Sequence, residues 1–191
     1  MSEEESQTED LEWPVQKKLN IWDEKRKYKS TLEELIDGHA RYAKFIKIKM
    51  GDDAMMEAFR ETIECTYDKN MGALNRLGVA FLSKVSKKIL HRKIVNSFFI
   101  NMQHVVELSC IRKLEYYPDY TEIIIDKCTG KRAWKMALKK NNANDLFSEE
   151  DYCKYSCIPL FNRFLTLSKA QTNAEFSKRG CHQIVKFIKK E

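Results

Sequence analysis

The stretch TEIIIDKC, residues 121–128, decides how the second half of the chain folds. Its β-branched run predicts a well-buried strand, because such side chains pack well on a pleated sheet. An alternating run from Leu108 to Tyr116 precedes it, and the sequence YPDY at 117–120 is typical of a turn. The sequence therefore predicts a β-hairpin whose second strand ends near Cys128.

Several further elements follow this hairpin. In order, they are a short helix around Trp134, a helix from Ser148 to about Phe164, a strand over 165–172 and a last strand over 181–188. Pro159 should kink or shorten the second of these helices, because proline cannot donate a backbone hydrogen bond. Residues 107–190 are thus expected to form a small antiparallel sheet with an inserted helix.

Residues 30–106 carry a mainly helical pattern of apolar positions three and four apart. Helices are expected to begin at Ser30, near Asp52 and near Asn70. Residues 94–106 are ambiguous between helix and strand, and we favour a continued helix. Helices followed by strands predict an α+β fold, with an N-terminal helical layer packed on the sheet.

The chain has 191 residues, which is enough for one domain with a substantial core. We expect a disordered acidic tail over residues 1–12 and a single α+β domain over residues 13–191. No stretch approaches the ~20 apolar residues that span a bilayer, so no membrane span is expected. The N-terminus lacks the basic and apolar regions of a signal peptide, which favours a cytoplasmic location.

The net charge is +6, and the lysines are scattered at helical spacing along expected solvent faces. No basic stripe is interleaved with exposed aromatic residues, so the pattern does not favour nucleic acid as a partner. The expected partner is a small molecule. The sequence leaves the oligomeric state open, with a homodimer as one option.

The chain contains six cysteines. In the cytoplasm they would stay reduced, which leaves core thiols, metal ligands and nucleophiles as their roles. Cys65 and Cys110 fit a plain core role best. Three others stand at the ends of expected elements, where a fold brings distant side chains together: Cys128, Cys153 and Cys181.

One interpretation of these cysteines is a metal centre. Cys153 and Cys157 are four residues apart, so they share a face of a helix. Cys128 together with Cys181 or His182 could complete a tetrahedral site with sulfur and nitrogen ligands, and such a site favours zinc or another thiophilic divalent metal. No Cys-x2-Cys motif is present, so the spacing is not that of a zinc ribbon.

A second interpretation is a cysteine nucleophile. Cys153 would lie in the first turn of its helix, where the helix dipole lowers a thiol pKa. His182 is the candidate base, although alternation along a strand places it on the opposite face from Cys181. A third interpretation gives the cysteines no role beyond packing. The spacing alone does not decide among the three.

The order of these motifs resembles the L-2-amino-thiazoline-4-carboxylic acid hydrolase family. The likeness lies in IIIDKCTGKRAW, DYCKYSC and FLTLSKAQTNAEFSKRGCHQIVKF, and its layout covers roughly residues 54–190. The resemblance implies an α+β fold similar to that of vinyl-reductase and transport-particle proteins. It also implies hydrolytic opening of a thiazoline ring that carries a carboxylate. Cys128, Cys153 and Cys181 match the family pattern and would line the site.

Two hypotheses of function follow. The first is a small-molecule hydrolase with Cys153 as nucleophile or metal ligand, supported by Cys128 and Cys181, with His182 as base. Arg132 or Arg179 would hold the substrate carboxylate. The expected aromatic lining of the pocket is Trp134, Tyr152 and Phe164. The second hypothesis is a sensory or interaction module that binds a metal or ligand at the same cysteines without turnover.

Overall fold

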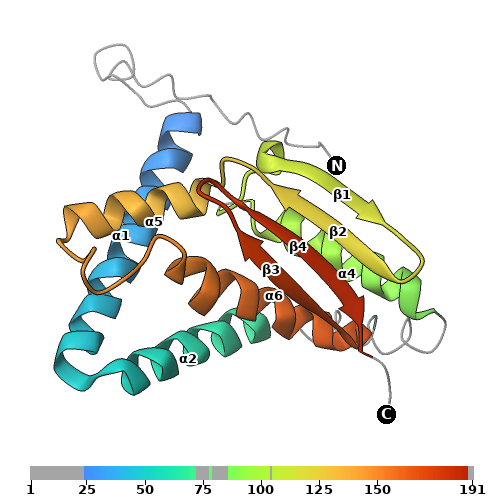
Figure 1. The fold of residues 1–191 in the computed structure, drawn as a ribbon, viewed down its shortest axis with the longest axis horizontal. Coiled ribbons are helices and arrows are strands. Elements are labelled where there is room, and N and C mark those ends of the chain that lie inside the picture. Colours follow the sequence, from blue (N-terminus) through green and yellow to red (C-terminus); the bar gives the residue numbers. More distant parts are fainter. Residues whose placement is uncertain (1–23, 72–77, 79–85, 104, 189–191) are drawn as a thin grey trace, which may run out of the picture.

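The computed structural model describes residues 24–71, 78, 86–103 and 105–188. Within them the chain forms an α+β fold, as predicted, with helices packed on a four-stranded antiparallel sheet (Figure 1). The expected tail over residues 1–12, most of the third expected helix and His104 lie outside the described residues. No helix in the described part of the chain has the length and apolar character needed to cross a membrane.

Helix α1, Glu24–Met50, begins earlier than the sequence predicted. Ser30 therefore lies inside the helix and is not its N-cap. The residues ahead of it are mostly Lys, Arg and Glu, which extend helices readily, and Lys29 pairs with Glu33 one turn later at 3.8 Å. The buried stripe of α1 consists of Leu32, Ile36, Ala40, Ala43 and Ile46.

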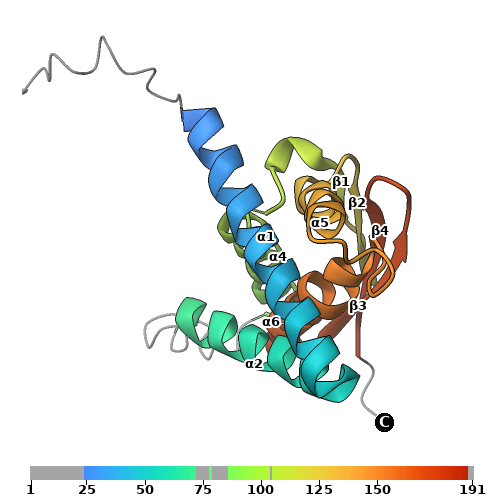
Figure 2. The same ribbon diagram turned by 90° about the vertical axis from the view of Figure 1, so that its left-hand side faces the viewer.

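Helix α2, Asp52–Asn70, follows α1 after the single residue Gly51. Gly51 has a φ of 91°, which glycine adopts at no steric cost, and this permits the sharp change of direction seen in Figure 2. Cys65 lies on α2 and is exposed, so its predicted core role is wrong. The buried stripe runs through Ile63 and Tyr67, and a residue two positions from each points to the other side of a helix.

Helix α4, Lys87–Asn101, is capped by Ser86, whose hydroxyl accepts from the N–H of Ile89 at 3.4 Å. It ends at Asn101, so the helix expected over residues 94–106 is confirmed only in its first part. Five apolar side chains of α4 are buried between the sheet and α6: Leu90, Ile94, Val95, Phe98 and Phe99.

The sheet consists of two hairpins laid side by side in the order β1-β2-β4-β3. Its strands are β1 Ile111–Tyr116, β2 Tyr120–Ile125, β3 Ala170–Phe176 and β4 Cys181–Phe187. Cys110 is buried as predicted, in a 3-10 turn just before β1. The expected strand over 165–172 was placed too early. Residues Thr166–Ser168 form a 3-10 turn, and Lys169 then adopts a φ of 53° that reverses the chain before β3.

The segment between β2 and β3 carries the inserted helices. Helix α5, Thr129–Lys140, packs against α1, and helix α6, Ile158–Leu165, packs against α2 and β3. A π-helical turn, Cys153–Cys157, leads into α6. Pro159 lies in the first turn of α6, so the wide turn ahead of it is the interruption that proline was expected to cause.

Candidate functional site

Cys128 is the N-cap residue of α5. The chain reverses just before it, because Lys127 adopts a φ of 53° in the left-handed region. The N–H of Cys128 then donates a hydrogen bond of 2.8 Å to the carbonyl of Arg179 in the β3–β4 turn. This bond holds the first turn of α5 against the tip of the second hairpin. A surface hollow lies at that junction.

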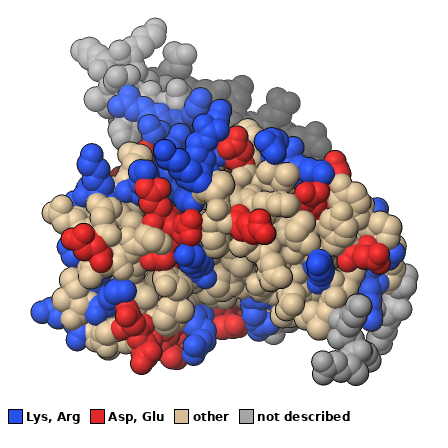
Figure 3. All heavy atoms as spheres, viewed as in Figure 1, with Lys and Arg blue, Asp and Glu red and all other residues tan. Residues whose placement is uncertain are grey.

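The hollow has a volume of about 270 Å³. Its lining is strongly basic and consists of Lys127, Cys128, Lys131, Arg132, Lys135, Glu149, Lys178 and Arg179. Figure 3 shows Lys and Arg side chains gathered over the region where α1 begins and the β3–β4 turn lies. Such a lining attracts anions, since uncompensated positive charge in a concave site focuses the local electrostatic potential.

Three residues predicted from the sequence meet in this hollow. Cys128 contributes the thiol, and Arg132 and Arg179 contribute guanidinium groups. Arg179 also pairs with Asp126 at 3.3 Å, which holds its side chain beside the turn. Arg132 is exposed, and its guanidinium has no hydrogen bond or ion pair with another described residue. Its guanidinium is therefore available for a ligand.

Lys131 is a residue of this site that sequence reasoning missed. Its side chain is only 5% exposed, and its ammonium donates to the carbonyl of Ser177 at 2.5 Å. Glu150 lies 4.0 Å away. Lys127, Lys135 and Lys178 were also missed. The available signal was the density of basic residues on both sides of Cys128 and ahead of Cys181.

Burial raises the pKa of the Cys128 thiol, while the backbone N–H groups of Gly130 and Lys131 oppose that shift. Burial is the larger effect, so the sulfur is a thiol at neutral pH. The first turn of α5 has no room for a larger residue at Gly130, because an added Cβ would lie 2.6 Å from Cγ1 of Val105. The glycine therefore lets α5 begin close to the turn that precedes β1.

The other three cysteines of the predicted site do not line the hollow. Cys153 and Cys181 are buried, and Cys157 is half-buried. These sulfurs lie close enough to Cys128 that a negative charge on one of them would raise the pKa of its neighbours. Burial raises the pKa of Cys153 to about 12 and the pKa values of Cys157 and Cys181 above their ordinary value.

The expected lowering of the Cys153 pKa is therefore wrong. Cys153 begins a π-helical turn in the interior, where loss of hydration outweighs any helix dipole. Cys181 accepts a hydrogen bond from the side-chain amide of Gln183 at 3.2 Å, but this contact does not offset its burial. Neither sulfur is a thiolate at neutral pH, so neither is an activated nucleophile in this state.

His182 lies on the open face of the sheet, away from the hollow. Its Nε2 is 2.9 Å from Oε1 of Glu122, and Lys113 pairs with the same carboxylate at 2.7 Å. Cys181 points to the covered face, as alternation along a strand requires. No bulge interrupts the pairing of β4 with β2, so His182 and Cys181 do not share a pocket and His182 is not placed to act as its base.

The aromatic residues expected around the ligand belong to the core. Trp134 is fully buried and donates from its indole N–H to the carbonyl of Ser148 at 3.0 Å. Tyr152 is also buried, with its ring centroid 5.7 Å from that of Trp134. Neither ring lines the hollow, and Phe164 does not line it either. Trp134 and Tyr152 instead pack on the buried side of α5.

The metal centre expected at the cysteines is not formed in the part of the chain that the structure describes. Within these residues, no group of three or more His, Cys, Asp or Glu side chains is arranged to hold a metal ion. The four cysteines lie within the described residues.

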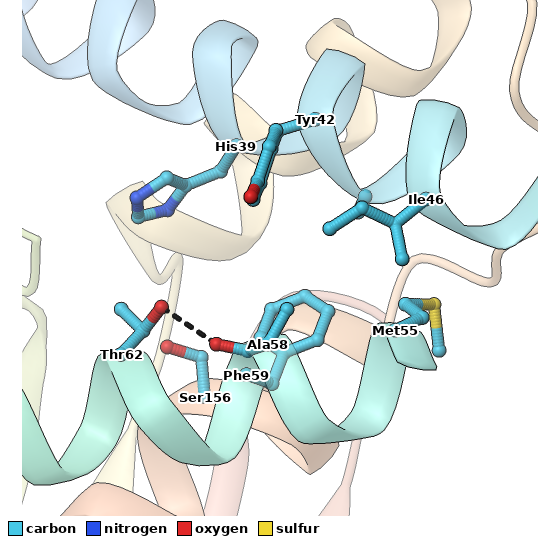
Figure 4. Close-up of a pocket in the computed structure, with 9 residues that line it drawn as sticks. His39, Tyr42, Ile46, Met55, Ala58, Phe59, Thr62 and Ser156 are labelled. Atoms are coloured by element: carbon cyan, nitrogen blue, oxygen red, sulfur yellow. Dashed lines mark hydrogen bonds between the residues drawn. The ribbon is translucent and has the colours of Figure 1, made fainter. Parts of the chain in front are cut away.

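A second pocket lies between α1 and α2, and Figure 4 shows its mostly apolar lining. Met55 and Phe59 come from α2, His39 and Ile46 come from α1, and Thr62 donates to the carbonyl of Ala58 at 2.8 Å. The space amounts to about 30 Å³, which holds one or two water molecules and not a metabolite. This pocket is therefore a packing gap between two helices.

Comparison of the chain with protein-family models, with curated proteins and with solved structures finds no match. The resemblance to the thiazoline-acid hydrolases thus stays a prediction from the sequence motifs. The hollow beside Cys128 is the candidate functional site of the described residues.

Proposed function

We propose that this chain binds a small anionic molecule in the basic hollow and opens it by hydrolysis, with a thiazoline-type carboxylate as the substrate class. The observation that supports this proposal is the meeting of Cys128, Arg132 and Arg179 in one hollow at the start of α5. A guanidinium binds a carboxylate through two parallel hydrogen bonds, which would fix the orientation of a small acid. The reacting ring would then lie beside the Cys128 sulfur.

Because burial raises the pKa of Cys128, we assign this thiol the role of proton donor in the proposed reaction. Water adds its hydroxyl group to the ring carbon between sulfur and nitrogen, and the ring carbon–sulfur bond breaks. The departing sulfur takes the proton of Cys128, and the attacking water restores that proton. The products are an open-chain acid and no further species. This role differs from the nucleophile expected at Cys153, whose pKa of about 12 opposes it.

The test is incubation of the full chain with L-2-amino-thiazoline-4-carboxylic acid, with mass spectrometry of the small molecules. Turnover adds the mass of one water to the substrate. Cys128→Ser should abolish turnover, and Cys65→Ser should leave it unchanged because Cys65 is exposed on α2, outside the hollow. Absence of the hydrated product above a protein-free control contradicts the proposed reaction.

A second candidate function is ligand binding without turnover. It is favoured by the raised pKa of each cysteine near the hollow, since no thiolate is present to attack a substrate. Under this function the thiazoline acid, or another small anion, would raise the melting temperature of the protein without being converted. Stabilisation together with an unchanged ligand mass distinguishes this outcome from hydrolysis.

A further inference from the structure

The hollow beside Cys128 holds more positive charge than one carboxylate would neutralise. Six of its eight lining residues are Lys or Arg, and the only acid among them is Glu149. Glu149 is already engaged, because its carboxylate lies 2.6 Å from the ammonium of Lys135. The charge balance of the hollow therefore depends on which of the other cations have partners.

Two of the remaining cations are partly compensated from outside the lining. Arg179 pairs with Asp126 at 3.3 Å. Lys131 donates to the carbonyl of Ser177 at 2.5 Å and lies 4.0 Å from Glu150. These contacts hold both side chains in place, so the two residues contribute positive charge at fixed positions in the hollow.

Three cations have no such compensation. Lys127, Arg132 and Lys178 line the hollow, and among the described residues the charged group of none of these side chains has a hydrogen bond or ion pair; their only such contacts are made by the main chain. They come from three separate places, namely the reversal after β2, the first turn of α5 and the β3–β4 turn. The fold brings three like charges to one concave surface, which raises the local positive potential and favours an anion between them.

We propose that the hollow binds a small molecule that carries a phosphoryl group, either a phosphate monoester or a diphosphate, with Lys127, Arg132 and Lys178 as its ligands. This inference rests on the anion binding of the proposed function and goes beyond it, because it makes a phosphoryl group, and not a carboxylate, the preferred anion of the hollow. A phosphoryl group carries about two negative charges and three acceptor oxygens, which matches three cations better than the single charge of a carboxylate.

The chemistry of each cation fits this assignment. Arg132 offers a planar fork that binds two phosphoryl oxygens at once, and Lys127 and Lys178 offer point charges from either side. Backbone N–H groups at the start of α5 add a favourable field for an anion. The volume of about 270 Å³ accommodates a phosphoryl group with a small organic part next to Cys128.

The test measures binding of inorganic pyrophosphate to the full chain by isothermal titration calorimetry, with acetate at matched ionic strength as the comparison anion. Pyrophosphate should bind at least ~10-fold more tightly than acetate, a difference of ~1.4 kcal/mol. The double variant Arg132→Gln/Lys178→Gln should weaken pyrophosphate binding by at least ~10-fold. Lys139→Gln should not, because Lys139 is an exposed residue at the far end of the same helix.

A second measurement locates the bound anion. Pyrophosphate should slow the alkylation of Cys128 by iodoacetamide several-fold, as read by peptide mass spectrometry, and leave the alkylation of the exposed Cys65 unchanged. Equal binding of acetate and pyrophosphate, or equal weakening by Lys139→Gln, overturns the inference. Pyrophosphate binding without opening of the thiazoline acid removes only the proposed reaction. Opening of the acid without preference for pyrophosphate removes only the phosphoryl assignment.

Discussion

The carbonyl of Arg179 accepts a hydrogen bond of 2.8 Å from the main-chain N–H of Cys128. The bond joins the first turn of α5 to the turn between β3 and β4, two segments that are far apart in the sequence. It also places the Cys128 thiol among cations that come from both segments. The hollow exists because this junction holds the two segments together.

The junction depends on Gly180, and its substitution should destabilise the protein. A Cβ at this position would overlap the main-chain carbonyl of Ile125, which belongs to β2 and cannot move aside without breaking the sheet. Gly180→Ala should lower the free energy of unfolding by ~2 kcal/mol or more, as overpacking does in cores. Urea denaturation measures the change.

Gly38→Ala is the matched control, because nothing lies within 4 Å of a Cβ at that position in α1. It should stabilise the protein by ~0.5–1 kcal/mol through helix propensity. Equal effects of the two substitutions would contradict the close approach at Gly180.

Stability should fall as the pH decreases below neutrality because of His91. This side chain is buried, with Nε2 2.9 Å from the hydroxyl of Thr121 and Nδ1 3.3 Å from that of Ser168. Burial lowers the pKa of His91 from 6.5 to about 4, so the unfolded chain takes up the proton first as the pH falls. The free energy of unfolding should therefore drop by about 2 kcal/mol between pH 7 and pH 5.

Urea denaturation at several pH values measures the slope of the free energy of unfolding against pH. His91→Gln should remove most of it, although the variant should be less stable at neutral pH because it loses a buried hydrogen bond. If the free energy of unfolding of His91→Gln depended on pH as strongly as that of the parent protein, groups other than His91 would cause the pH dependence.

The thiols should differ widely in their rates of alkylation at pH 8. Cys65 is exposed and should react first. Cys153 should react on the order of a hundredfold or more slowly, because it is buried and its pKa is about 12. Cys128 should be intermediate, since it lines a hollow open to solvent. Peptide mass spectrometry at timed intervals ranks the three, and rapid alkylation of Cys153 in the folded protein would disprove its burial.

His182 should be dispensable for binding and turnover. It lies on the open face of the sheet against Glu122, with its side chain 41% exposed. His182→Gln should change the affinity for pyrophosphate by less than twofold and the free energy of unfolding by less than ~1 kcal/mol, the usual range for an exposed pair. A large loss of turnover in this variant, with stability unchanged, would return His182 to the site.

Much of the fold could be predicted from local sequence patterns. The β-branched run at 121–128, the YPDY turn and the Gly51 break each specify backbone geometry within a few residues. The start of α1 was missed because charged helix formers extend a helix without contributing to an apolar stripe. The start of β3 was missed because a 3-10 turn and the left-handed Lys169 interrupt a run whose alternation already resembles a strand.

The candidate site was predictable only in part. Cys128, Arg132 and Arg179 were selected from their chemistry and their places at element ends, and they share the hollow. Cys153 was selected for the same reasons, yet it is sealed in the interior. Position along a chain does not report the loss of hydration that controls a thiol pKa, because that loss depends on what the rest of the fold packs against the sulfur.

By itself, the sequence determined the first hairpin, the last strand, the approximate course of α2, α5 and α6 and the density of basic residues around Cys128, because each depends on neighbouring residues. Tertiary structure alone decided the strand order β1-β2-β4-β3, in which Ile125 of β2 pairs with Cys181 of β4. That pairing carries the β3–β4 turn to the start of α5 and gathers Lys127, Arg132 and Lys178 on one surface. It also turns His182 to the opposite face. Long-range pairing depends on the burial of whole surfaces, which no local pattern encodes.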